Sequence, residues 1–167
     1  MALHISADSR AAKLKTSFQN LSSASKILND ASDAFGGAIT SLDEALNNLN
    51  PGVRAWVTVS SSGADEDAPW LIFEERLGYD KTSGRWGLSL CTVTVNGPAG
   101  EEEAIDSWLF NDAPRNLRLR AVDHVPMLIE ALAKEASQTA QRVSEQADYA
   151  RDLAQSISAL ASEKGGR

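Results

Sequence analysis

The sequence predicts an α+β protein in which long N- and C-terminal helices flank a four-stranded antiparallel β-meander, in the order α-β-β-β-β-α. Two observations predict this class. In both terminal thirds, apolar residues recur at steps of three and four, as in amphipathic helices. In the middle third they alternate with polar residues, as in half-buried strands. We expect a single domain over residues 1–167, with a helix over 6–50, a meander over 53–110 and a kinked helix over 112–163.

The first predicted helix contains no proline and carries a heptad seam along one face. Asn50-Pro51-Gly52 ends it, because proline lacks the next backbone donor and glycine accepts a left-handed turn. The two rows of the seam are Leu14, Leu21, Leu28, Phe35, Leu42, Leu49 and Phe18, Ser25, Ser32, Ile39, Leu46.

The C-terminal region repeats this design over an equal length. Its rows are Val125, Leu132, Thr139, Gln146, Leu153, Leu160 and Ile129, Ala136, Val143, Ala150, Ile157. The match predicts that the two helices pair antiparallel, with Leu49 near Val125 and Leu14 near Leu160.

Alanines recur every seven residues beside both seams, at Ala24, Ala31, Ala38, Ala45 and at Ala133, Ala140, Ala147, Ala154, Ala161. Alanine favours any helix, but its strict spacing in both helices favours close helix packing. The middle of each seam is polar and buries little. We therefore expect a second copy to pack there as a homodimer, with an oligomer seam of Ser25, Ser32, Ala140, Ala147 and Ala154.

Four strands are predicted between the helices, over 53–60, 70–79, 85–95 and 104–110. Asp80 to Gly84 has the composition of a five-residue hairpin loop. Asp112-Ala113-Pro114 resembles a helix cap and first turn, with a short helix to Val122 and a restart near Pro126. The sequence leaves open whether the helices project as a stalk or cover the sheet.

Composition excludes several classes of protein. The 167 residues are 43% hydrophobic and carry a net charge of -7, which disfavours disorder and a general nucleic-acid surface. No apolar stretch has the length of a membrane span, and the N-terminal residues lack the apolar region of a signal peptide. A single cysteine excludes an internal disulfide. We expect a cytoplasmic protein.

Two clusters of charge are candidate partner-binding sites. The acidic runs Asp65, Glu66, Asp67 and Glu101, Glu102, Glu103 are expected in loops at one end of the meander. There they would bind a basic partner or a cation, or simply discourage sheet association, and their spacing is not that of a calcium loop. The arginines Arg115, Arg118 and Arg120 suit phosphate or carboxylate recognition, or pair with Asp112 and Asp123.

Trp56 falls on the polar face of its strand and is the predicted exposed aromatic anchor. Cys91 is expected to be a buried apolar residue, and a nucleophilic pair with His124 is the less favoured alternative. No catalytic motif, metal spacing or cofactor loop is present, so we expect no enzyme activity, cofactor or metal.

These features predict a non-enzymatic protein-protein interaction module, an oligomeric adaptor, inhibitor or assembly factor. The alternative is a small-molecule or nucleic-acid binder that uses the sheet face and the Arg115–Arg120 cluster. Two long helices bracketing a meander are similar in arrangement to prefoldin-type chaperone subunits. No motif supports the similarity, so no activity or partner is inferred from it.

Overall fold

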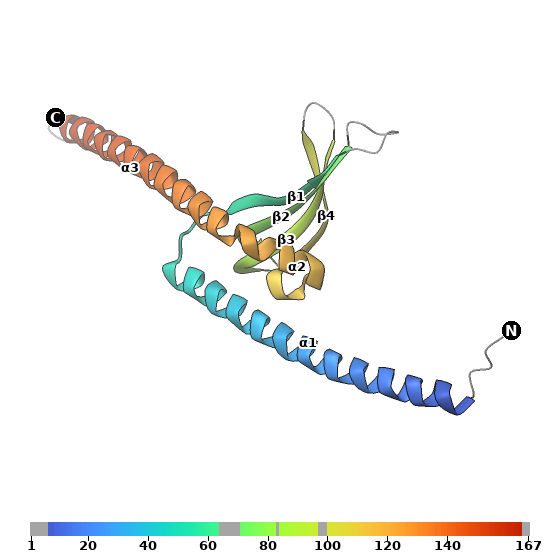
Figure 1. Ribbon diagram of the computed structural model, residues 1–167. Coiled ribbons are helices and arrows are strands. Elements are labelled where there is room, and N and C mark those ends of the chain that lie inside the picture. The colour runs from blue at the N-terminus through green and yellow to red at the C-terminus, as the bar shows by residue number, and fades with distance from the viewer. Residues whose placement is uncertain (1–6, 64–70, 83, 97–99, 165–167) are drawn as a thin grey trace. The chain divides into compact units, whose positions relative to one another are not determined.

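The computed structural model describes residues 7–63, 71–82, 84–96 and 100–164. It confirms the predicted α+β class and the order of a long helix, a four-stranded antiparallel sheet and a C-terminal helical region (Figure 1). The chain divides into two compact units, Met1–Leu42 and Asp43–Arg167, and each is described by itself. The main elements are α1 (Ala7–Leu49), β1 (Ala55–Ser62), β2 (Leu71–Thr82), β3 (Arg85–Asn96), β4 (Glu101–Leu109), α2 (Arg115–Ala121) and α3 (Val125–Lys164).

Helix α1 ends where the sequence predicts. Its last turn is closed by the backbone N–H of Asn50, which donates to the carbonyl of Leu46 at 3.1 Å. Asn50 has φ of 45° and Gly52 has φ of 67°, so the chain turns through the left-handed region that these two residue types tolerate best. Gly36 and Gly37 do not break the helix, which is continuous across them.

The four strands form a meander in the order β1-β2-β3-β4, and every neighbouring pair is antiparallel. The register shifts between Thr58 and Ser60 in β1. This irregularity corrects the simple alternation expected for β1, because Ser60 lies opposite Glu75 instead of sharing the face of Trp56. An extra residue in a strand changes which face the following side chains occupy.

The β2–β3 hairpin is tighter than predicted. The expected five-residue loop is wrong, because Asp80, Lys81 and Thr82 belong to β2 and Thr82 lies opposite Arg85. Gly84 has φ of 84°, a conformation that glycine adopts without a steric penalty. The strands therefore continue to the turn, as they do in two-residue hairpins.

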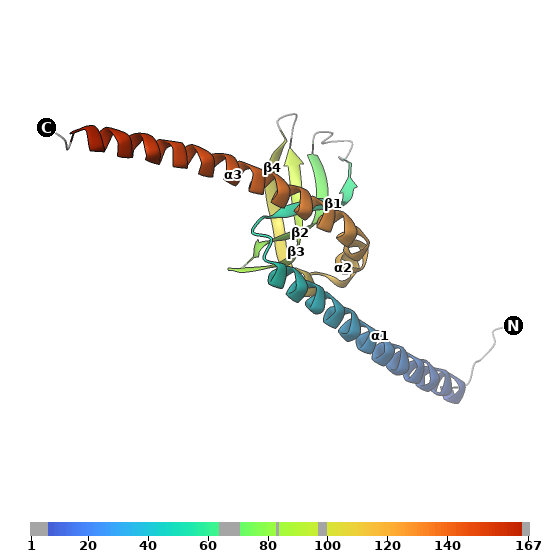
Figure 2. The ribbon, with the colours of Figure 1, turned by 90° about the vertical axis from the view of Figure 1, so that its left-hand side faces the viewer.

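In the unit Asp43–Arg167, the core lies between one face of the sheet and the helices packed on it (Figure 2). Leu77 and Leu90 lie opposite each other on β2 and β3 and are fully buried. Leu117 and Ala121 of α2 are buried as well. The other large buried side chains are Leu46, Tyr79, Leu88, Phe110, Leu128 and Leu132.

The C-terminal helical region restarts where predicted. A 3-10 turn over Val122–His124 separates α2 from α3, and Pro126 lies in the first turn of α3, where its missing N–H is no loss. The first turns of α3 pack near the sheet, and the helix then runs on well beyond it (Figures 1 and 2). The proposed pairing of α1 with α3 along their full length would join the two units and stays a prediction.

Candidate protein-binding surfaces

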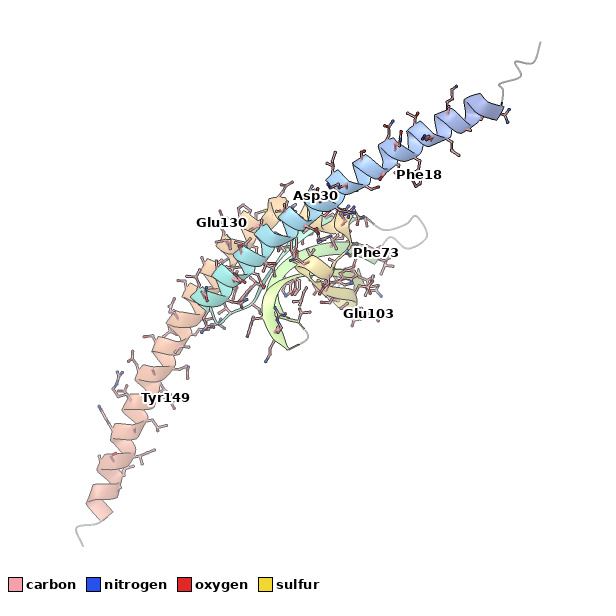
Figure 3. All side chains as sticks on the ribbon, turned by 90° about the horizontal axis from the view of Figure 1, so that it is seen from below. Phe18, Asp30, Phe73, Glu103, Glu130 and Tyr149 are labelled. Atoms are coloured by element: carbon pink, nitrogen blue, oxygen red, sulfur yellow. The ribbon has the colours of Figure 1, made fainter. Side chains whose placement is uncertain are left out.

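An exposed apolar stripe runs along α3 beyond the sheet. Leu132, near the start of the helix, is 4% exposed, whereas Leu153, Ile157 and Leu160 near its end are 47%, 58% and 63% exposed. All four belong to the predicted heptad seam, so they share one face of the helix. Figure 3 shows the side chains around Tyr149 radiating from this part of α3. The stripe leaves the core and continues without cover from its own unit.

A small apolar groove lies at the base of this stripe. Its volume is about 160 Å³. Both walls of the groove belong to the unit Asp43–Arg167, since one wall is the end of α1 and the other is the start of α3. The lining residues are Leu46, Leu49, Pro51, Ile129, Leu132, Ala133 and Ala136, all of them apolar. The stripe therefore starts in a depression.

In the unit Met1–Leu42, taken by itself, the described residues 7–42 form a helix with an apolar stripe of its own. Leu14, Phe18 and Leu21 are 73%, 71% and 62% exposed. Figure 3 labels Phe18 on this helix. Single exposed apolar side chains are ordinary, but a sustained seam on a long helix is typical of a surface that another helix covers.

The last turn of α1 is held to the sheet by polar contacts. Asp43 accepts a hydrogen bond from the backbone N–H of Leu88 at 2.6 Å, and the hydroxyl of Tyr79 donates to Oδ1 of Asn47 at 2.8 Å. Trp86 stacks on Tyr79, with ring centroids 5.5 Å apart. Burial raises the pKa of Tyr79, and the nearby Asp43 carboxylate adds to this effect. These bonds fix one wall of the groove.

Trp56 is not the exposed anchor that the sequence predicts. Its side chain is half-buried, and its indole ring lies over Gly78 on the neighbouring strand. A β-carbon at residue 78 would overlap the ring, so glycine is what allows the ring to lie flat on the sheet. A role for Trp56 in binding a partner stays a prediction. Trp70 lies outside the described residues.

An ion-pair network crosses the sheet face opposite to α2. Arg76 on β2 contacts Glu74 at 2.8 Å and both carboxylate oxygens of Glu102 at 2.7 and 2.9 Å. The hydrogen bond from Arg76 lowers the pKa of Glu102, and the pKa of Arg76 is raised by the same contact. One arginine is therefore shared by two carboxylates, and the network keeps one uncompensated negative charge.

The structure describes one of the two acidic runs. Glu101, Glu102 and Glu103 were expected in a loop, but they begin the edge strand β4 and are exposed (Figure 3 labels Glu103). Glu102 is engaged by Arg76. Asp65, Glu66 and Asp67 lie outside the described residues. Whether either run binds a basic partner stays a prediction.

One arginine of the cluster forms an ion pair within the fold. Arg120 contacts Glu75 at 2.6 and 2.7 Å, rather than the expected Asp112 or Asp123. This hydrogen bond lowers the pKa of Glu75. Arg115 is exposed, and Arg118 is half-buried, with its Nε atom buried and unpartnered among the described residues. Sequence reasoning missed Glu75, because it lies far along the chain and only the sheet brings it to α2.

Cys91 is buried, as expected, and burial raises its pKa to about 11. It lies opposite Arg76, whereas the adjacent pair Glu75 and Thr92 belongs to the face that meets α2. Since neighbouring strand residues point to opposite faces, Cys91 points away from the helices that carry His124. His124 instead lies 3.2 Å from the carbonyl of Arg120. The geometry disfavours a nucleophilic pair of these two residues.

The predicted oligomer seam is available on the surface. Ser25, Ala140, Ala147 and Ala154 are exposed, and Ser32 is half-buried. Within the described ranges, no three His, Cys, Asp or Glu side chains gather as a metal site. No described helix combines the length and apolar character needed to cross a bilayer.

Comparisons with protein-family models, curated proteins and solved structures found no match. Sequence reasoning identified the α3 stripe by its heptad period. It also predicted that the end of α1 lies near the start of α3, with Leu49 near Val125, but it did not predict the groove that Leu46 and Leu49 line there with Ile129.

Proposed function

We propose that this protein is a non-enzymatic protein-protein interaction module, an adaptor, inhibitor or assembly factor that works as a homo-oligomer. The observation that carries the proposal is the apolar seam of α3, in which Leu132 near the start is buried, whereas the large apolar side chains further along are exposed: Val143, Leu153, Ile157 and Leu160. Bringing each such side chain out of water stabilises a complex by roughly 1 kcal/mol or more. A partner protein that covers the stripe therefore forms a complex that is stabilised by this burial.

Two further features support a protein partner over a small molecule. The stripe is long and narrow, which fits another helix laid along it. The apolar groove at its base holds about 160 Å³, less than the 300–1,000 Å³ typical of ligand pockets. A groove of this size fits one or two apolar side chains of a partner. We also propose a cytoplasmic location, in keeping with a lone buried thiol.

Two variants of the exposed seam test this function. Val143→Glu and Leu153→Glu place charges on the stripe, beyond the sheet, where both side chains are exposed. Gln155→Glu, on the opposite side of the same helix, is the matched control. Partners that copurify with the protein from its native host are identified and purified. Their affinity for each variant is then measured by calorimetry.

We expect the two stripe variants to weaken reconstituted binding at least tenfold and the control to leave it unchanged. Circular dichroism confirms that the variants stay folded. The proposal is refuted if the purified protein neither self-associates nor binds any protein in a way that the stripe variants weaken.

The alternative function, small-molecule or nucleic-acid binding through the sheet face and Arg115–Arg120, stays a prediction. Arg120 is paired with Glu75, and Arg76 on the opposite sheet face is paired with Glu74 and Glu102. These arginines are therefore already engaged by carboxylates of the same chain. Salt-dependent oligonucleotide binding that is lost in Arg115→Ala and Arg118→Ala variants would support it.

A further inference from the structure

We infer that the partner of the α3 stripe is a second copy of α3, laid antiparallel across a twofold axis near the middle of the stripe. The inference rests on the proposed function and deepens it by naming the partner and the register. It replaces the predicted full-length pairing of α3 with α1, because both pairings would use the same seam of α3. Each apolar groove then receives the end of the other copy's α3, with the side chains of Leu153, Ile157 and Leu160.

The apolar groove and the C-terminal end of α3 match each other in chemistry. The groove lies at the N-terminal end of α3 and is lined by apolar residues alone. Three of the exposed apolar side chains of the seam, Leu153, Ile157 and Leu160, lie at the C-terminal end of the same helix. An antiparallel pair brings each groove to the opposite helix's apolar end, so both are covered by one symmetric contact.

The residues of the seam determine the register of the pair. Pairing Ile129 with Leu160 of the second copy places Leu132 beside Ile157 and Ala136 beside Leu153 of that copy. At mid-seam, Val143 meets Gln146 of the second copy. Large residues meet at both ends, and a small residue accepts a large one between them, as close packing requires.

The alanines beside the seam meet one another in the pair. In this register Ala140 faces Ala147 of the second copy, and Ala133 faces Ala154. All four lack bulk beyond Cβ, so the two backbones approach closely along this flank. The opposite flank places Arg142 near the ring of Tyr149 of the second copy, a cation-π arrangement. Both side chains are exposed in the single chain.

The length of the contact suits a reversible dimer. Residues 129–160 span about 48 Å, and a band one helix diameter wide covers about 500 Å² of projected surface on each partner. This is near the lower limit of specific interfaces, at about 600 Å² per partner. We therefore expect a dimer that dissociates at micromolar concentration.

Cysteine cross-linking tests the register in the full chain. In a Cys91→Ser background, two variants with distinct tags, Ala140→Cys and Ala147→Cys, are oxidised separately and as a mixture. Gln155→Cys, on the opposite face of α3, is the matched control. In the antiparallel register, the mixture yields a disulfide-linked heterodimer, and each variant alone cross-links no faster than the control.

Light scattering over a micromolar concentration series supplies the second measurement. We expect a dimer that Ile157→Glu converts to a monomer, with an unchanged circular dichroism spectrum, and that Gln155→Glu leaves intact. Cross-links between like cysteines, an unlinked mixture, or a monomer at all concentrations overturns the inference. If the monomeric protein still binds a different protein through the stripe, the proposed protein-binding role survives, whereas the homo-oligomer and the α3 pairing do not.

Discussion

Replacing Gly78 with alanine tests how the ring of Trp56 packs on the sheet face opposite to the helices. Gly78 is buried and lies between Trp56 on β1 and Ser89 on β3. A β-carbon there would overlap Cδ2, Cε3 and Cε2 of the Trp56 ring. The strand backbone is held on both sides by ladder hydrogen bonds, so we expect the ring to move instead.

The cost follows from the area that the ring covers. A tryptophan buries roughly 150–250 Å². Exposing about 100 Å² of it costs about 2.5 kcal/mol at 25 cal/mol per Å². The lower chain entropy of alanine in the unfolded state offsets about 0.5 kcal/mol of this. We expect Gly78→Ala to lower the free energy of unfolding by about 2 kcal/mol, and Tm by roughly 4–8 °C.

Urea unfolding followed by tryptophan fluorescence and circular dichroism measures the change. Gly63→Ala is the matched control, because a β-carbon there has no atom within 4 Å, and we expect a change below about 0.5 kcal/mol. In a Trp56→Leu background, the cost of Gly78→Ala should fall to less than half. An equally stable Gly78→Ala variant, or an equal cost in both backgrounds, refutes the reasoning.

Three more predictions concern buried and paired groups. Asp43→Ala leaves the amide of Leu88 without its acceptor and should destabilise the protein by about 1–3 kcal/mol in urea unfolding, and an unchanged midpoint contradicts this. Cys91, with its pKa raised to about 11, should react with a thiol reagent at pH 8 only after unfolding; rapid labelling of the native protein refutes this. Arg120 lowers the pKa of Glu75, so the pair stabilises the fold above the ordinary carboxyl pKa, and this stability is lost as pH falls through the lowered value. Both side chains are partly exposed, so Glu75→Gln should remove roughly 0.5 kcal/mol at pH 7 and nothing at pH 2, and an equal effect at both pH values contradicts the assignment.

Much of the fold could be predicted because its signals are local. The step of seven along α1 and α3 and the alternation in β1 are properties of neighbouring residues, and they predict the type and order of the elements. The stop at Asn50-Pro51-Gly52 and the restart near Pro126 depend on the backbone chemistry of those residues alone.

The sequence predictions are wrong where one extra residue in a strand or one contact with a distant residue determines where a side chain lies. The irregularity between Thr58 and Ser60 in β1 changes the face of the residues that follow, and no local pattern marks it. Trp56 lies at a position that alternation assigns to the polar face, but the bare backbone of Gly78 allows its ring to be half-buried.

For the candidate site, the sequence by itself determined the α3 stripe, since a heptad period places its residues on one face of any α-helix. Only the tertiary structure decided that Leu46 and Leu49 line a groove with Ile129, and that Glu75 rather than Asp112 or Asp123 holds Arg120. The physical reason is the range of the interactions. Helix periodicity depends on residues within a few positions of one another, whereas grooves and ion pairs depend on which distant segments the packed core brings together.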